Sequence, residues 1–138
     1  MRPSAAGRAV DILLALIFSS FVAVQYNDPD PLQWMGIYGA AMIAFGYDAW
    51  RGVKWWAPLA VAAVALPWAA YLFSRVVGTP GFPSFGVGQG MISSSVEETR
   101  EMGGLVIVVV TMASLAVRAR LRLSRRASAA GTPAPLRA

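Results

Sequence analysis

The sequence predicts an all-α integral membrane protein, a bundle of four transmembrane helices. Of its 138 residues, 57% are hydrophobic and only 14% are charged, whereas soluble domains carry about 25% charged residues. The apolar residues gather in four stretches, and ten of the twelve Lys and Arg residues fall on one side of the topology that these stretches define. The length favours one domain, which we place at residues 1–126, followed by a short tail.

The four stretches, residues 9–26, 32–50, 55–73 and 103–117, are each close to the ~20 residues that a helix needs to cross the bilayer. The last stretch is short, but its flanks, residues 96–102 and 118–126, contain no Pro or Gly and suit a continuing helix. The third and fourth stretches are joined by a Gly- and Pro-rich outer loop, residues 74–95. This loop either folds against the membrane surface or is disordered. Residues 127–138 are Ala- and Pro-rich and predict a flexible cytoplasmic tail.

The charges predict the orientation. Both termini and the short turn near residues 51–54 share one side, which holds ten basic and two acidic residues. The other side holds two basic and five acidic residues. Because cytoplasmic loops are enriched in Lys and Arg, both termini are expected in the cytoplasm, and in a bacterium the membrane would be the plasma (inner) membrane.

A run of arginines follows the fourth stretch. Near an anionic leaflet each arginine could contribute about 1 kcal/mol of attraction. We therefore expect membrane lipids as partners, and do not expect nucleic acid. A protein partner within the membrane stays open. The arginines assigned to anionic headgroups are Arg118, Arg120, Arg122, Arg125 and Arg126.

The chain contains no Cys and no His. Thiolate and imidazole ligands, disulfides and the commonest general base are therefore absent, so no cofactor is expected and no catalytic residue is assigned. No charged residue lies near the middle of a stretch, which argues against ion translocation by this chain alone. The deepest polar groups are hydroxyls, expected to bond back to their own helices; they belong to Ser19, Ser20, Thr111 and Ser114.

The turn between the first two stretches is unusually polar. Asp30 and Pro31 suit the N-cap and first position of the second helix. Asn27, Asp28 and Pro29 suit a tight turn. This account leaves Asp28 without a required role.

A second acidic group, with Glu97, Glu98, Arg100 and Glu101, comes just before the fourth stretch. Glu97 and Glu101 share a helical face, a like-charge arrangement that costs a few tenths of a kcal/mol unless a cation offsets it. Helix capping and a salt bridge would account for this segment without a ligand. The alternative is an outer polar cluster with the first turn, in which a divalent cation such as calcium, or an amine, is bound; the candidate metal ligands are Asp28, Asp30, Glu97 and Glu101.

Two separated motifs resemble the transmembrane protein 220 family over about residues 11–117. The motifs are Gln25, Asn27-Asp28-Pro29-Asp30, Trp34 and Tyr38, then Glu97-Glu98-Thr99-Arg100-Glu101 and Gly104-Leu105-Val106-Ile107. The resemblance implies a compact multi-helix membrane protein and places both acidic segments in one site. It implies no particular activity.

Three hypotheses about function follow. The first is a non-enzymatic accessory or interaction subunit, favoured by the absence of His, Cys and mid-membrane charge. The second is a protein that binds or transports a cation or small ligand at the outer acidic cluster. The third is a membrane enzyme with Glu97 or Glu101 as general base, which requires a carboxylate of raised pKa beside a pocket.

Overall fold

The computed structural model describes residues 3–28, 30–79 and 94–130, and within them it contains helices and no strand. The first helix, α1 (Ala5–Val24), is extended by one 3-10 turn, η1 (Gln25–Asn27). It is followed by α2 (Pro31–Arg51), α3 (Trp56–Val76) and α4 (Ser94–Ala130). The predicted all-α class is confirmed.

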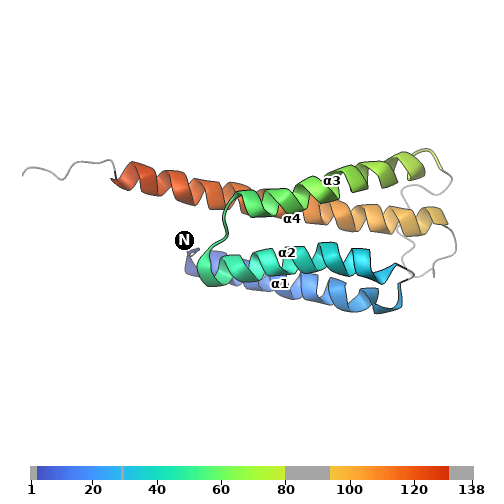
Figure 1. Cartoon of the computed structure of the whole chain (residues 1–138), viewed down its shortest axis with the longest axis horizontal. Helices are drawn as coiled ribbons and strands as arrows, with labels where there is room; N and C mark the ends of the chain where they lie inside the picture. Colours follow the sequence, from blue (N-terminus) through green and yellow to red (C-terminus); the bar gives the residue numbers. More distant parts are fainter. Residues whose placement is uncertain (1–2, 29, 80–93, 131–138) are drawn as a thin grey trace, which may run out of the picture.

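The helices lie side by side as two antiparallel pairs, α1 with α2 and α3 with α4, and α2 contacts both members of the second pair (Figure 1). One end of the bundle carries the start of α1 and the arginine-rich part of α4; we call it the arginine end. The opposite end carries Asp28, after η1, and Glu101, near the start of α4; we call it the acidic end. The polar segments are thus separated along the bundle.

The observed helices extend beyond the predicted stretches. Residues 96–102 and 118–126 do continue the fourth helix, as their lack of helix breakers predicts. Helix α4 also includes residues 127–130, which were expected in a flexible tail, and helix α3 reaches Val76, inside the predicted loop. Most of that loop, residues 80–93, and the end of the tail, residues 131–138, lie outside the described residues.

Among the described helices, α1 with η1, α3 and α4 are long and apolar enough to cross a membrane. Helix α2 has sufficient length, at 21 residues, but falls short in hydropathy. It carries Gln33, Asp48 and several Gly, Trp and Tyr residues, which are less hydropathic than aliphatic ones. A multi-pass membrane protein is therefore supported, with three clear spans rather than four.

Aromatic side chains join the helices in the core. Phe18 of α1 stacks on Phe45 of α2, with ring centroids 6.0 Å apart. Trp34 of α2 stacks on Trp68 of α3 at 4.5 Å. Many aliphatic side chains, among them Leu16, point outward, as expected where lipid replaces water.

Helix α2 approaches α4 closely at one glycine. A methyl group placed on Gly104 would overlap the hydroxyl oxygen of Tyr38. Only a residue without a Cβ lets the tyrosine occupy this position, which is how small residues generally permit close helix packing in membranes.

The hydroxyl groups within the apolar stretches bond back to their own helices, as expected. Ser19 donates to the carbonyl of Leu16, and Thr111 to that of Ile107, each at 2.7 Å. The hydroxyls of Ser20 and Ser114 likewise donate to carbonyls that lie one turn before them in their helices. These hydroxyls are thus satisfied without a ligand.

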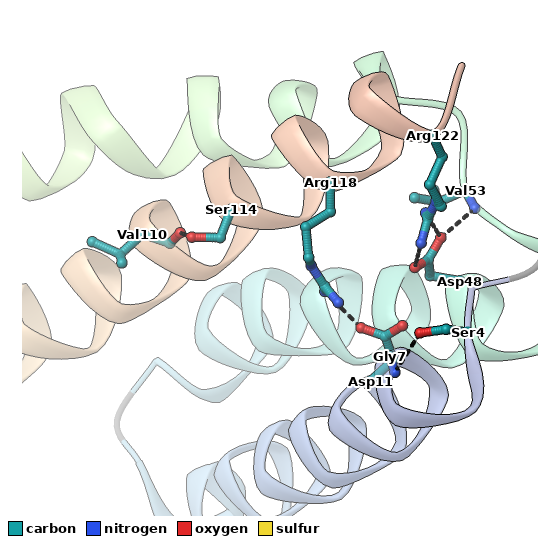
Figure 2. Close-up of polar contacts among 9 residues, drawn as sticks. All are labelled: Ser4, Gly7, Asp11, Asp48, Val53, Val110, Ser114, Arg118 and Arg122. Carbon is teal, nitrogen blue, oxygen red and sulfur yellow. Dashed lines mark hydrogen bonds and ion pairs between the residues drawn. The ribbon is translucent and has the colours of Figure 1, made fainter. Parts of the chain in front are cut away.

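Two wholly buried aspartates at the arginine end pair with arginines of α4 (Figure 2). Arg118 donates to Asp11 Oδ1 at 2.6 Å. Arg122 donates to both carboxylate oxygens of Asp48, at 2.5 and 3.0 Å, and the backbone N–H of Val53 donates to the same carboxylate at 2.7 Å. The two ion pairs tie α1 and α2 to α4.

Candidate binding pocket at the acidic end

A pocket of about 170 Å³ opens at the acidic end. Its lining comes from the η1 turn, from α2 and from the first turns of α4. It contains three carboxylates, a guanidinium, an amide and two aromatic rings. The lining residues are Gln25, Asp28, Trp34, Tyr38, Glu97, Arg100 and Glu101.

The turn after α1 holds Asp28 in place. Its backbone N–H donates to the carbonyl of Gln25 at 3.1 Å, and its Oδ1 accepts from the backbone N–H of Asp30, also at 3.1 Å. This short-range bond is typical of aspartate in turns. Asp28 therefore takes part in the turn that its residue type suits, and its side chain supplies a specific hydrogen bond there, in addition to its place beside the pocket.

Helix α4 places Glu97 and Glu101 one turn apart on the same face, and both reach the pocket. Glu101 lies just before the apolar stretch 103–117. Burial raises the pKa of its carboxyl from 4.5 to about 7, and the negative charges of Glu97 and Asp28 add to the effect. Ionising Glu101 is therefore costly unless a cation is nearby.

The aromatic side of the pocket is formed by α2. Trp34 and Tyr38 are one turn apart on this helix, with ring centroids separated by 6.1 Å. Trp34 is 2% exposed, and its indole Nε1 has no hydrogen-bond partner among the described residues. A buried donor without a partner is uncommon and calls for an explanation such as a ligand.

The structure brings together four of the seven predicted site residues: Asp28, Glu97, Arg100 and Glu101. The other three do not line the pocket. Glu98 instead accepts from Arg75 of α3 at 2.8 Å. Asp30 does occupy the N-cap position of α2, but its side chain makes no capping hydrogen bond, and Asn27 ends the η1 turn.

The described residues contain no group of three or more acidic side chains placed to hold a metal ion. Of the four candidate metal ligands, Asp28, Glu97 and Glu101 share the pocket and Asp30 does not. The geometry therefore favours a diffuse negative site over a compact coordination sphere.

Three lining residues, Gln25, Trp34 and Tyr38, were not predicted as site residues. A signal for them was present, because all three belong to the motifs on which the family resemblance rests. Every lining residue in fact falls within those motifs, as does Gly104, against which Tyr38 packs. The pocket is thus lined entirely by residues of these two motifs, although not every motif residue lines it.

Comparison with known proteins identifies a family but no individual relative. No curated protein and no solved structure matches the chain. A protein-family model described as "Transmembrane family 220, helix" matches residues 17–117, which run from the middle of α1 to the apolar centre of α4 and include every pocket residue. Since the match covers well over half of the chain, this protein belongs to transmembrane family 220.

Proposed function

We propose that this protein binds a small ligand carrying a protonated amine in the pocket at the acidic end. The observation that carries the proposal is that Asp28, Glu97 and Glu101 line one pocket together with two aromatic rings. Carboxylates pair with an ammonium group, and the faces of Trp and Tyr attract cations.

The size and charge of the pocket restrict the kinds of ligand that it can bind. Sites for drug-sized molecules measure about 300–1,000 Å³, so a pocket of about 170 Å³ suits a single ammonium group with a few carbons. Three carboxylates face one guanidinium, Arg100, which leaves an excess of negative charge. An amine fits better than a divalent metal, which needs several carboxylate oxygens at about 2.3–2.6 Å if it is calcium.

The membrane arrangement is part of the proposal. We propose that α2 is the fourth span and that its less apolar face is accommodated against α1, α3 and α4. Both termini would then be cytoplasmic and the pocket would open on the opposite side, at the plasma membrane in a bacterium. The positive charge at the arginine end supports this orientation.

Thermal unfolding in detergent tests ligand binding. Ethylammonium should raise the unfolding temperature of the wild type, and the double variant Asp28→Asn with Glu101→Gln should abolish the shift. Glu97→Gln should reduce the shift, while its neighbour Glu98→Gln is the matched control, since Glu98 faces Arg75 instead of the pocket. Glu98→Gln should keep the shift even where its lost ion pair lowers the starting temperature.

The same thermal unfolding experiment tests the other possible ligands. A shift with calcium and none with ethylammonium would replace the amine by a metal. No shift with either, together with a protein that co-purifies in stoichiometric amount, would favour the accessory-subunit hypothesis. Binding of ethylammonium should also be stronger at pH 8 than at pH 6, because Glu101, with a pKa of about 7, gains its charge in that interval.

A second candidate function is an enzyme in which Glu101 accepts a proton from the ligand. The observation that favours it is a half-buried carboxyl of pKa about 7 beside a pocket, since a general base works best with a pKa near the operating pH. Native mass spectrometry of wild type and Glu101→Gln would distinguish the two. A co-purifying molecule whose mass differs between them indicates turnover, whereas equal masses indicate binding alone.

A further inference from the structure

A second pocket, of about 290 Å³, lies at the arginine end, where the start of α1 meets α4. Three of its lining residues are arginines, spaced about one turn apart along α4. The lining residues are Pro3, Ser4, Gly7, Arg118, Leu121, Arg122 and Arg125.

Two of these guanidinium groups are held in place by ion pairs with buried aspartates. Arg118 and Arg122 are paired with the buried carboxylates of Asp11 and Asp48, while 34% and 22% of their own side chains remain exposed. A guanidinium has five N–H donors. The hydrogen bonds to the aspartates use one nitrogen of Arg118 and two of Arg122, which leaves further N–H donors on each guanidinium. Because the side chains are already ordered, binding there costs little additional conformational entropy.

The charge balance leaves this pocket positive. Arg125 is exposed, and no described carboxylate pairs with it, so three arginines stand against two aspartates. The first turn of α1 contains no acidic residue to offset the partial positive charge of the helix start. An anion is the ligand that this arrangement attracts.

We propose that the three arginines bind the phosphate group of an anionic phospholipid. Phosphate offers several acceptor oxygens, which guanidinium groups bind in forked geometry. The chain belongs to a membrane family, and the pocket also includes Leu121, half-exposed and able to contact the start of an acyl chain. This site is at the opposite end from the amine pocket and does not depend on it.

Adjacent arginines provide a matched pair of variants. Arg125 lines the pocket, whereas Arg126, which is also exposed and carries the same charge, does not. Purified protein in neutral detergent would be titrated with phosphatidylglycerol, phosphatidylcholine or inorganic phosphate, and bound lipid measured by native mass spectrometry. Arg125→Gln should weaken binding of phosphatidylglycerol about tenfold, the effect of one lost charge-assisted hydrogen bond. Arg126→Gln should weaken it less than about fivefold, through general surface charge.

The lipid titrations distinguish a phosphate site in this pocket from general attraction by surface charge. Preference for phosphatidylglycerol over phosphatidylcholine, with the larger loss at Arg125, supports a lipid phosphate site. Displacement of the lipid by inorganic phosphate supports the same chemistry with a soluble source. Equal losses for the two variants, or equal binding of both lipids, would overturn the proposal. Arg125→Lys, which keeps the charge but not the fork, should fall between wild type and Arg125→Gln, and each variant should unfold at the wild-type temperature without lipid.

Discussion

The carboxylate of Asp48 accepts more hydrogen bonds than that of Asp11, the other buried aspartate at the arginine end. Asp48 is wholly buried, and its carboxylate accepts two hydrogen bonds from Arg122 and one from the backbone of Val53. Asp11 is equally buried, but its Oδ2 has no partner and its arginine, Arg118, is the more exposed of the two. Removing the aspartate from each ion pair should therefore lower the free energy of unfolding by different amounts.

We predict that Asp48→Ala lowers the free energy of unfolding by about 3 kcal/mol, because it leaves Arg122 charged and only partly solvated. Asp11→Ala should cost less, about 1–2 kcal/mol. Unfolding in mixed detergent micelles measures both. The double variant Asp48→Leu with Arg122→Met should lie within about 1 kcal/mol of the wild type, since an apolar pair can replace a buried ion pair. An Asp11→Ala variant less stable than Asp48→Ala would contradict this ranking.

Glu101 makes stability depend on pH. Its pKa is raised from 4.5 to about 7 in the folded protein, so its favourable contribution is complete below pH 4.5 and is lost as the pH rises through about 7. The unfolding temperature should therefore fall between pH 5 and pH 8, in the absence of ligand. Glu101→Gln should flatten this dependence and Glu98→Gln should not. Parallel curves for wild type and Glu101→Gln would show that Glu101 is not the group responsible.

These residue pairings could not be predicted from the sequence. Asp11 and Arg118 are 107 positions apart, and Asp48 and Arg122 are 74 apart. Helical periodicity indicates that Arg118 and Arg122 share a face, but not which helix that face meets. The sequence therefore predicted lipid contacts for both arginines, and the aspartates entered only as charges on the same side.

At the scale of helices, α2 and α4 approach most tightly where Tyr38 packs against Gly104, because a methyl group on that glycine would overlap the tyrosine hydroxyl. The same tyrosine lines the pocket at the acidic end. Helix packing and pocket shape are therefore coupled at this crossing.

We predict that Gly104→Ala lowers stability by about 1–3 kcal/mol, because the added methyl group overlaps the Tyr38 hydroxyl and the core must shift. Gly36→Ala is the control, since a methyl group there meets no atom within 4 Å. Combining Gly104→Ala with Tyr38→Phe should restore part of the loss by removing the overlapping oxygen. Additive effects of the two changes in thermal unfolding would show that this contact does not limit the helix approach.

Helix positions were more predictable than pairings, for physical reasons. The apolar runs and the Asp30-Pro31 start predicted the positions of α1, α2 and α3 to within a few residues. The absence of Pro and Gly beside the last run predicted that α4 extends beyond its apolar stretch at both ends. The site was predictable in part. The resemblance placed both acidic segments together, but only packing decides that Glu98 turns towards Arg75 while Glu97 turns into the pocket.

At the scale of the whole molecule, charge is sorted between the two ends of the bundle. One pocket is lined by η1, α2 and the start of α4, the other by the start of α1 and the later part of α4. These segments lie at opposite ends of the bundle (Figure 1). If the protein crosses the membrane four times, each pocket meets a different aqueous phase.

Because the chain contains no cysteine, single substitutions can report this topology without background. Tyr26→Cys, at an 80% exposed position near the acidic end, should react with an impermeant maleimide in intact cells. Lys54→Cys and Ala127→Cys, at the arginine end, should react only after permeabilisation. Labelling of positions 26 and 54 from the same side would mean that α2 does not cross.

The length of α4 has a practical consequence for imaging this protein. Its 37 residues span about 55 Å at 1.5 Å per residue, and its last turns project beyond the other helices (Figure 1). A chain of 14.7 kDa offers too little mass for particle alignment by electron microscopy. A soluble helical protein joined in phase at Ala130 would continue this rod without a hinge and act as a rigid fiducial. Adding or deleting one residue at the junction would rotate it by about 100°.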